Sequence, residues 1–236
     1  MKCELKKYLC LIAMSLLMTI HAQTINRYGT TTANFLEIGV GSSGTAMGDA
    51  YVAVASDVSS IYWNPAGLSN VPKSSALFMI QPWLVDIDML FAGGAMVIPR
   101  VGVIGLGITH LDYGEMDVTN LQYQDGTGER FGASDVAAAL TFSRKIVSWF
   151  SFGSSIKYIG SNIWHSSASA FAVDLGVLVN TNFFSFTGQD KDGMNIGMSI
   201  SNYGTRMKYD GIDSYQPIDI SEYEDGNYGD VAGQFR

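Results

Sequence analysis

The sequence predicts an all-β protein: an antiparallel transmembrane β-barrel, of which part is present. The first observation is that no segment after residue 22 has 18 consecutive apolar residues, which makes a helical membrane protein unlikely. The second is that side chains alternate with a period of two from Ser74 onward. The third is segment length: about ten residues fits a tilted strand crossing hydrocarbon, whereas average strands of soluble proteins have about five or six.

Seven strands are expected, at 75–83, 87–98, 101–110, 135–145, 150–160, 168–180 and 194–203. In these strands bulky apolar side chains alternate with Gly, Ala, Ser and isolated charges. The small face suits a polar or plugged lumen, and the bulky face suits lipid. For 168–180 we expect Phe171, Val173, Leu175 and Val177 to face lipid, and Ala170, Ala172 and Asp174 to face the lumen. A register error of one residue would exchange the two sets.

The connections alternate in length. Pro99-Arg100 and Ile146–Trp149 are tight, whereas Asp112–Ser134 and Gly204–Arg236 are long and polar. Outer-membrane barrels have short periplasmic turns and long outer loops, although the link at 181–193 is longer than such a turn usually is. Aromatic residues near strand ends are typical of interface girdles: Trp83, Trp149, Phe150, Tyr158, Trp164 and Tyr203. A secreted, water-soluble β protein is the alternative.

The number of strands is odd, and bacterial single-chain barrels have even numbers. The sequence also ends at Gly233–Arg236 inside the last predicted loop, with no strand after it. An unpaired strand edge is not tolerated in lipid. The expectation is therefore a fragment, residues 74–236, that lacks the strands closing the barrel. It should form a curved, open sheet around residues 34–68. The outer edges of the first and the last strand should have no hydrogen-bonding partner strand.

The first 22 residues have the pattern of a cleaved signal peptide. Lys2, Lys6 and Lys7 precede an apolar run from Leu9 to Ile20, and cleavage is expected after Ala22. Both cysteines, Cys3 and Cys10, lie in this segment, so the mature chain has no disulfide or thiol site. The mature chain has 11 basic and 21 acidic residues, a net charge of −10 that makes a nucleic-acid partner unlikely.

No motif points to an enzyme, a cofactor or a metal. Residues 39–44 fit G-x-G-x-x-G, but no βαβ unit surrounds them, so a closely packed, flexible turn is the better interpretation. His110 and His165 are isolated and are expected at a barrel end or in a loop. The acidic tract Glu222–Asn227 lacks the spacing of a calcium loop and is interpreted as a solvated loop, with loose divalent binding as the alternative.

The most informative stretch, within an expected hatch or plug at residues 23–73, is FLEIGVGSSGTAMGDAYVAVASDVSSIYWNPAGL from Phe35 to Leu68. It is rich in small residues and lacks the ten-residue alternation. Its Asn64-Pro65-Ala66-Gly67 motif is a turn signal, because proline fixes φ and glycine allows a positive φ. The motif is the candidate site of this chain, with no catalytic, cofactor or metal residue assigned.

This stretch resembles the N-terminal signature of the PorV/PorQ family, relatives of the FadL-type transporters. The resemblance implies an outer-membrane barrel of about fourteen strands with an N-terminal hatch, and it places Asn64–Gly67 in that hatch. It also implies a role in type IX secretion in Bacteroidota-like bacteria. There PorV-type barrels receive cargo proteins for surface attachment, so the implied partners are outer-membrane lipid, secreted cargo and other secretion components.

The alternative function is a FadL-like channel for hydrophobic small molecules. A fatty-acid route needs a continuous apolar pocket with a basic residue for the carboxylate. The expected inner faces are mostly Gly, Ala and Ser, with a few charges such as Lys157 and Asp174. This composition favours the secretion component.

Overall fold

The computed structural model describes residues 32–187, 193–212, 215–217 and 232–234. The chain divides into two units, Met1–Thr32 and Ala33–Arg236, and every element described below belongs to the second. The expected signal peptide and the acidic tract Glu222–Asn227 lie outside the described residues.

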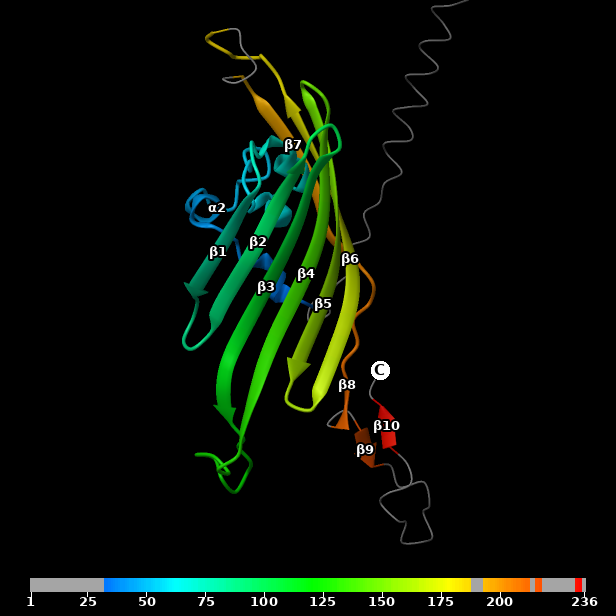
Figure 1. Ribbon diagram of the computed structural model, residues 1–236. Helices are drawn as coiled ribbons and strands as arrows, with labels where there is room; N and C mark the ends of the chain where they lie inside the picture. Colours follow the sequence, from blue (N-terminus) through cyan, green and yellow to red (C-terminus); the bar gives the residue numbers. More distant parts are fainter. Residues whose placement is uncertain (1–31, 188–192, 213–214, 218–231, 235–236) are drawn as a thin grey trace, which may run out of the picture. The chain divides into compact units, whose positions relative to one another are not determined.

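Seven long strands form one antiparallel sheet in the order of the sequence (Figure 1). Each of the seven predicted strands is present. Their bounds are β1 Ser75–Pro82, β2 Asp88–Ile98, β3 Gly102–Asp117, β4 Arg130–Val147, β5 Phe150–Ile163, β6 Ser166–Asn180 and β7 Asn195–Gly204. The period of two was therefore sufficient to locate the sheet.

The loop predicted at Asp112–Ser134 is shorter in the structure than the sequence suggested. Strands β3 and β4 continue into it, past a bulge between Asp112 and Glu115, so the loop is only 118–129. The added part is held by polar contacts, since Arg130 pairs with both Glu115 and Asp117 at 3.1 and 3.0 Å. Apolar alternation gives no sign of such a polar extension. Because β3 continues to Asp117, His110 lies inside this strand and not at its end as predicted. His165 is in the 164–165 turn, as expected.

The predicted long loop Gly204–Arg236 is also interrupted by short strands. The chain continues beside β6, where the Thr205 N–H donates to the Phe171 carbonyl at 2.8 Å. A short β8 (Asp210–Gly211) then pairs with β6. Two further short strands, β9 (Tyr215–Pro217) and β10 (Ala232–Gln234), pair with each other.

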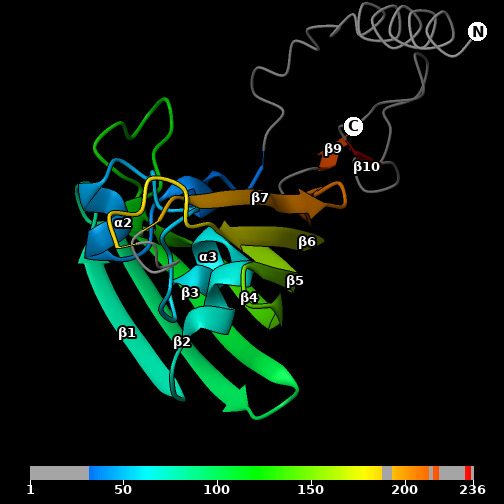
Figure 2. The ribbon, with the colours of Figure 1, turned by 90° about the horizontal axis from the view of Figure 1, so that it is seen from above.

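The sheet is curved and open (Figure 2). Among the described residues, β1 pairs only with β2, and β7 pairs only with β6. The expectation that the first and seventh strands do not close on each other is confirmed.

Residues 33–71, here called the N-terminal segment, lie inside the curve of the sheet (Figure 2). They contain four short helices: η1 Asn34–Glu37, α2 Ser42–Ala46, α3 Ser60–Trp63 and η2 Pro65–Asn70. The segment supplies most of the larger buried apolar side chains, which pack against β2 to β6 in two clusters. These side chains are Phe35, Leu36, Val40, Val58, Ile61, Leu68 and Val71.

Strand β6 has the predicted facing. Phe171 is 60% exposed on the outer face, whereas Asp174 is fully buried on the inner one. Ala170 and Ala172 are also buried, and Val173 and Leu175 are exposed. The outer face of the sheet is thus apolar, and no residue that the structure describes covers it.

The expectation of small inner side chains fails in β2 and β3. Met89, Phe91 and Leu111 are bulky and point inward, where they pack with Phe35, Leu36 and Val40. These three side chains point inward because the N-terminal segment has apolar side chains on the surface that faces β2 and β3. Burial of this apolar surface stabilises the contact.

Three of the predicted girdle residues lie in turns. Trp83 follows β1, Trp149 joins β4 to β5 and Trp164 joins β5 to β6, and each is about half exposed. Phe150 begins β5, and Tyr203 lies near the end of β7. Tyr158 is not near a strand end, as a girdle residue should be, because β5 extends to Ile163. It lies in mid-strand against Phe171, with ring centroids 5.4 Å apart. No helix in the described part of the chain is long and apolar enough to cross a membrane.

Candidate functional site

Asn64 lies at the centre of the contact between the N-terminal segment and the sheet. Its side-chain oxygen accepts a hydrogen bond from the Ala66 N–H at 3.0 Å and so caps η2, with Pro65 at the first helical position. Its amide group donates to the Val52 carbonyl at 2.9 Å and to the Val177 carbonyl of β6 at 3.1 Å. One fully buried side chain therefore joins the turn, the preceding loop and the sheet.

The predicted turn residues Asn64–Gly67, here called the Asn64 turn, are all buried. Gly67 does not use the positive φ that the motif suggested. It is needed for space, since a Cβ there would collide with the Ala55 carbonyl. The sequence signal for a turn was correct, but the reason for the glycine is a tertiary contact.

Two strand glycines receive the Asn64 turn. A Cβ at Gly153 in β5 would collide with the backbone of Pro65 and Ala66, and one at Gly176 in β6 would collide with Asn64. Nearby, the Ser143 hydroxyl of β4 donates to the Ala66 carbonyl at 3.0 Å. The small inner faces of β4 to β6 therefore allow backbone to approach backbone.

The glycine motif at 39–44 packs around Trp63. A Cβ at Gly39 or Gly44 would be too close to the indole ring, and the indole N–H donates to the Val40 carbonyl at 2.8 Å. Gly41 has φ +88°, a conformation that suits glycine. The close packing expected for this motif is present, but residues 42–44 belong to helix α2 and not to a turn.

A buried ion pair crosses the inner faces of β5 and β6. Lys157 Nζ lies 2.7 Å from Asp174 Oδ2, and the two side chains are 6% and 1% exposed. Asn202 completes the group: its N–H donates to Asp174 Oδ1 at 2.7 Å, and its side-chain oxygen accepts from Lys157 at 2.9 Å. Lys157, Asp174 and Asn202 are here called the ion-pair cluster.

The ion-pair cluster depends on an irregularity in the sheet. The register between β6 and β7 shifts at Asp174, and Asn202 has φ +57°. Asparagine tolerates this conformation better than most residues. It occurs at Asn202, whose N–H donates to the Asp174 carboxylate. The sequence did show lone charges on two adjacent inner faces. It gave no sign of the bulge, which depends on the pairing with β7.

Tyr62 fixes the start of the N-terminal segment. Its hydroxyl donates to the Leu36 carbonyl at 2.8 Å. Burial raises the pKa of the Tyr62 phenol well above its usual value, and the negative charges of Asp49 and Glu37 raise it further. The phenol therefore stays neutral and keeps its donor proton.

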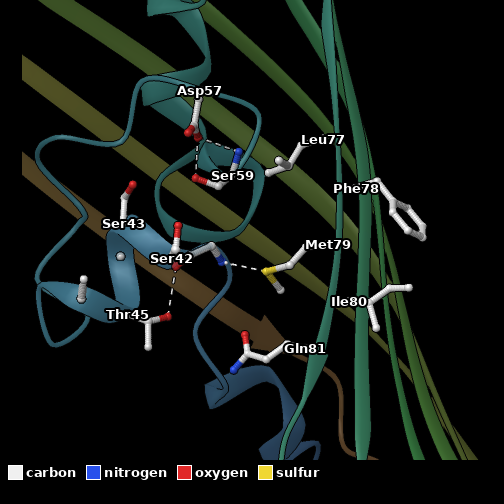
Figure 3. A pocket seen from close by; sticks show the side chains of 13 residues that line it. Ser42, Ser43, Thr45, Asp57, Ser59, Leu77, Phe78, Met79, Ile80 and Gln81 are labelled. Atoms are coloured by element: carbon white, nitrogen blue, oxygen red, sulfur yellow. Dashed lines mark hydrogen bonds between the residues drawn. The ribbon is translucent and has the colours of Figure 1, made fainter.

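A pocket of about 680 Å³ lies between α2 and β1 (Figure 3). Leu77, Met79 and Gln81 point toward it, whereas Phe78 and Ile80 point away. Its other walls carry hydroxyl groups from Ser42, Ser43, Thr45 and Ser59, and the carboxylate of Asp57. None of the described lining residues is basic, so the pocket is poorly suited to the carboxylate of a fatty acid.

No group of three or more His, Cys, Asp or Glu side chains that could hold a metal occurs among the described residues. His165 stacks on Trp164 with ring centroids 4.3 Å apart.

The fold and the site define a class: an antiparallel β protein with an apolar outer face, whose curved sheet holds its own N-terminal segment through buried glycine and polar contacts. Within that class, the family model described as type IX secretion system protein PorV matches residues 21–223. The chain belongs to this family, which is known as a secretion component and not as an enzyme. No curated protein and no solved structure matches the chain.

Proposed function

We propose that this PorV family protein is exported by a cleaved signal peptide, lies in the outer membrane and receives cargo proteins for attachment to the cell surface. The domain arrangement proposed with it is a signal peptide at 1–22, a hatch at 23–73 and part of a transmembrane β-barrel wall from residue 74. The observation that carries the proposal is the apolar outer face of the sheet in a chain of a secretion family.

The outer face supports a lipid environment. Large apolar side chains from neighbouring strands are exposed together there, among them Leu106, Leu140, Ile156, Leu175 and Met198. Soluble monomers rarely expose apolar surface over so wide an area. The inner face, in contrast, buries hydroxyl groups and an ion pair, an arrangement that suits a barrel interior.

The hatch proposal rests on how tightly residues 33–71 are held. Asn64 bonds to β6, Ser143 bonds to the Asn64 turn, and Gly153 and Gly176 leave no space between turn and sheet. Such a segment obstructs the interior. Together with the pocket that lacks a basic side chain, this favours a secretion role over a channel for hydrophobic small molecules.

Fractionation tests the location. The protein should be recovered in the outer-membrane fraction with Gln23 as its first residue. Recovery as a soluble periplasmic protein would contradict the proposal.

A deletion strain tests the secretion role. Without the gene, secreted proteins that depend on type IX secretion should no longer be attached at the cell surface, and a plasmid copy should restore them. Unchanged surface attachment would contradict the cargo role while leaving the membrane location intact.

A further inference from the structure

Charged side chains in the sheet are separated between its two ends. At the end where β2 and β4 finish and β3 and β5 begin, with the connections 99–101 and 148–149, the charged residues that the structure describes are all basic: Lys73, Arg100, Arg144 and Lys145. The opposite end, with the connections 83–87 and 118–129, is rich in acids, among them Asp86, Asp112, Glu115, Asp117 and Glu129. The four basic residues are here called the basic collar.

Arg144 is placed at the border of the apolar outer face. It follows Leu140 and Phe142 on the outward side of β4, and these two are 53% and 39% exposed. Across the strand pair it lies opposite Phe152, which is also outward. An arginine at such a border lays its aliphatic stem on apolar surface and extends its guanidinium group to the polar boundary.

The other members of the basic collar lie nearby and are exposed. Val103 of β3 pairs with Ser143 of β4, so the turn that leads into β3 and carries Arg100 lies at the same end of the sheet as Arg144. Lys145 follows Arg144 directly. No ion pair to a described residue neutralises any of the four.

Exposed aromatic side chains mark the same end. Trp149 is 53% exposed in the turn next to Lys145, and its ring lies 5.8 Å from that of Phe150. Phe183 and Phe184, in the connection from β6 to β7, are 66% and 85% exposed. Aromatic rings of this kind sit at the level of lipid headgroups. The basic collar is therefore at the depth of the lipid phosphates if the outer face is in a bilayer.

We propose that the basic collar binds the headgroups of anionic phospholipids, with Arg100 and Arg144 contacting the phosphates and the exposed Lys145, on the other side of β4, adding positive charge at the same end. The inference rests on the proposed membrane location and adds a lipid class to it. Charge complementarity selects the headgroup. A zwitterionic lipid brings an amine that finds no carboxylate among the described residues of this end, whereas an anionic lipid brings only negative charge. The adjoining apolar face selects a lipid over a free phosphate.

Tryptophan quenching by brominated lipid tests the proposal. The protein carries Trp83→Phe and Trp164→Phe, so that Trp149 is the exposed tryptophan, since Trp63 is 8% exposed in the N-terminal segment. It is folded into phosphatidylcholine vesicles in which a minor component is brominated, either phosphatidylglycerol or phosphatidylcholine. Brominated phosphatidylglycerol should associate with the Trp149 end roughly threefold more strongly, and added salt should reduce this preference.

A matched pair of variants locates the effect. Arg100→Gln, Arg144→Gln and Lys145→Gln together should abolish the preference for phosphatidylglycerol. The control variant removes the same amount of positive charge outside the basic collar, through Arg130→Gln, Arg206→Gln and Lys208→Gln. It should retain the preference for phosphatidylglycerol. Equal quenching by both lipids in the parent protein, or a preference that survives in the collar variant, would overturn the proposal. Absence of quenching by either lipid would instead overturn the membrane location, and this inference with it.

Discussion

Strands β2 and β3 meet the N-terminal segment with the large side chains of Met89, Phe91 and Leu111, whereas β5 and β6 meet the Asn64 turn with glycine. Phe91 and Leu111 pack on apolar side chains of the segment. Gly153 and Gly176 instead touch the Asn64 turn, and Lys157 is paired with Asp174. The difference follows from distance: side chains fill the gap in the first case, whereas in the second the backbone of the turn approaches the backbone of the sheet and only glycine fits.

The comparison has an energetic consequence. Apolar packing is tolerant of substitutions that conserve volume. Hydrogen bonds and ion pairs in a buried place are not, because loss of one partner leaves the other unsatisfied. Single substitutions in β5 and β6 should therefore be more damaging than conservative ones in β2 and β3.

The largest effect is expected from Lys157→Met. It leaves the buried Asp174 carboxylate without its cation, which should lower the free energy of unfolding by roughly 3–5 kcal/mol in urea titration of the folded protein. The double variant Lys157→Met with Asp174→Leu removes both charges and should recover much of the loss. A loss of less than about 1 kcal/mol in the single variant would mean that the pair behaves like a surface pair.

A smaller loss of folding free energy is expected from Leu175→Arg. This substitution tests the apolar outer face, to which both pairs of strands compared above contribute. Leu175 is 44% exposed on that face, and an arginine near mid-bilayer should cost roughly 2–4 kcal/mol for folding into lipid vesicles. Leu121→Arg is the control, because Leu121 is 95% exposed in the 118–129 loop. Equal stability of the two variants in vesicles would argue that the outer face does not contact lipid.

The glycine contrast gives the third prediction. Gly153→Ala places a Cβ against the backbone of Pro65 and Ala66, which cannot move aside, so we expect a loss of roughly 1–3 kcal/mol. Gly107→Ala in β3 is the matched control. The nearest neighbours of its Cβ are side-chain atoms of Ile61 at 2.9 and 3.7 Å and of Phe91 at 3.6 Å, and not backbone atoms at 2.3 to 2.5 Å as for Gly153, so its effect should be smaller. The reverse order in urea unfolding would contradict the explanation by approach distance.

The smallest effect is expected from Asn64→Ala, at roughly 1–2 kcal/mol, because the cap of η2 and the bond to Val177 are lost together. Asn70→Ala, at the last residue of the same helix, is the control and should be near neutral. Limited proteolysis provides a second readout, since a loosened N-terminal segment should be cleaved faster in the Asn64 variant. Equal cleavage of both variants would show that Asn64 does not anchor the segment.

Several features could be predicted from residue patterns alone. Alternation located the seven long strands and the facing of β6, and the Asn64–Gly67 sequence located a turn. The resemblance in residues 35–68 led to the family that the chain belongs to. Such features are local: a period of two or a proline followed by glycine acts through the backbone of its own segment.

Other features depended on partners distant in the sequence. The extension of β3 and β4, the strands after Gly204 and the inward Phe91 each result from a neighbour that the local pattern does not contain. The same holds for the ion-pair cluster, which requires the β6–β7 bulge.

The sequence by itself determined where the seven long strands lie, which residues of a strand share a face and where the turn at Asn64 occurs, because these follow from short-range backbone preferences. Only the tertiary structure decided that bulky side chains of β2 and β3 face the N-terminal segment, and how closely each strand approaches that segment. That decision made Gly153 and Gly176 necessary, paired Lys157 with Asp174 and collected the basic residues at one end of the sheet. The physical reason is that close packing and charge pairing depend on distances in space between residues far apart along the chain.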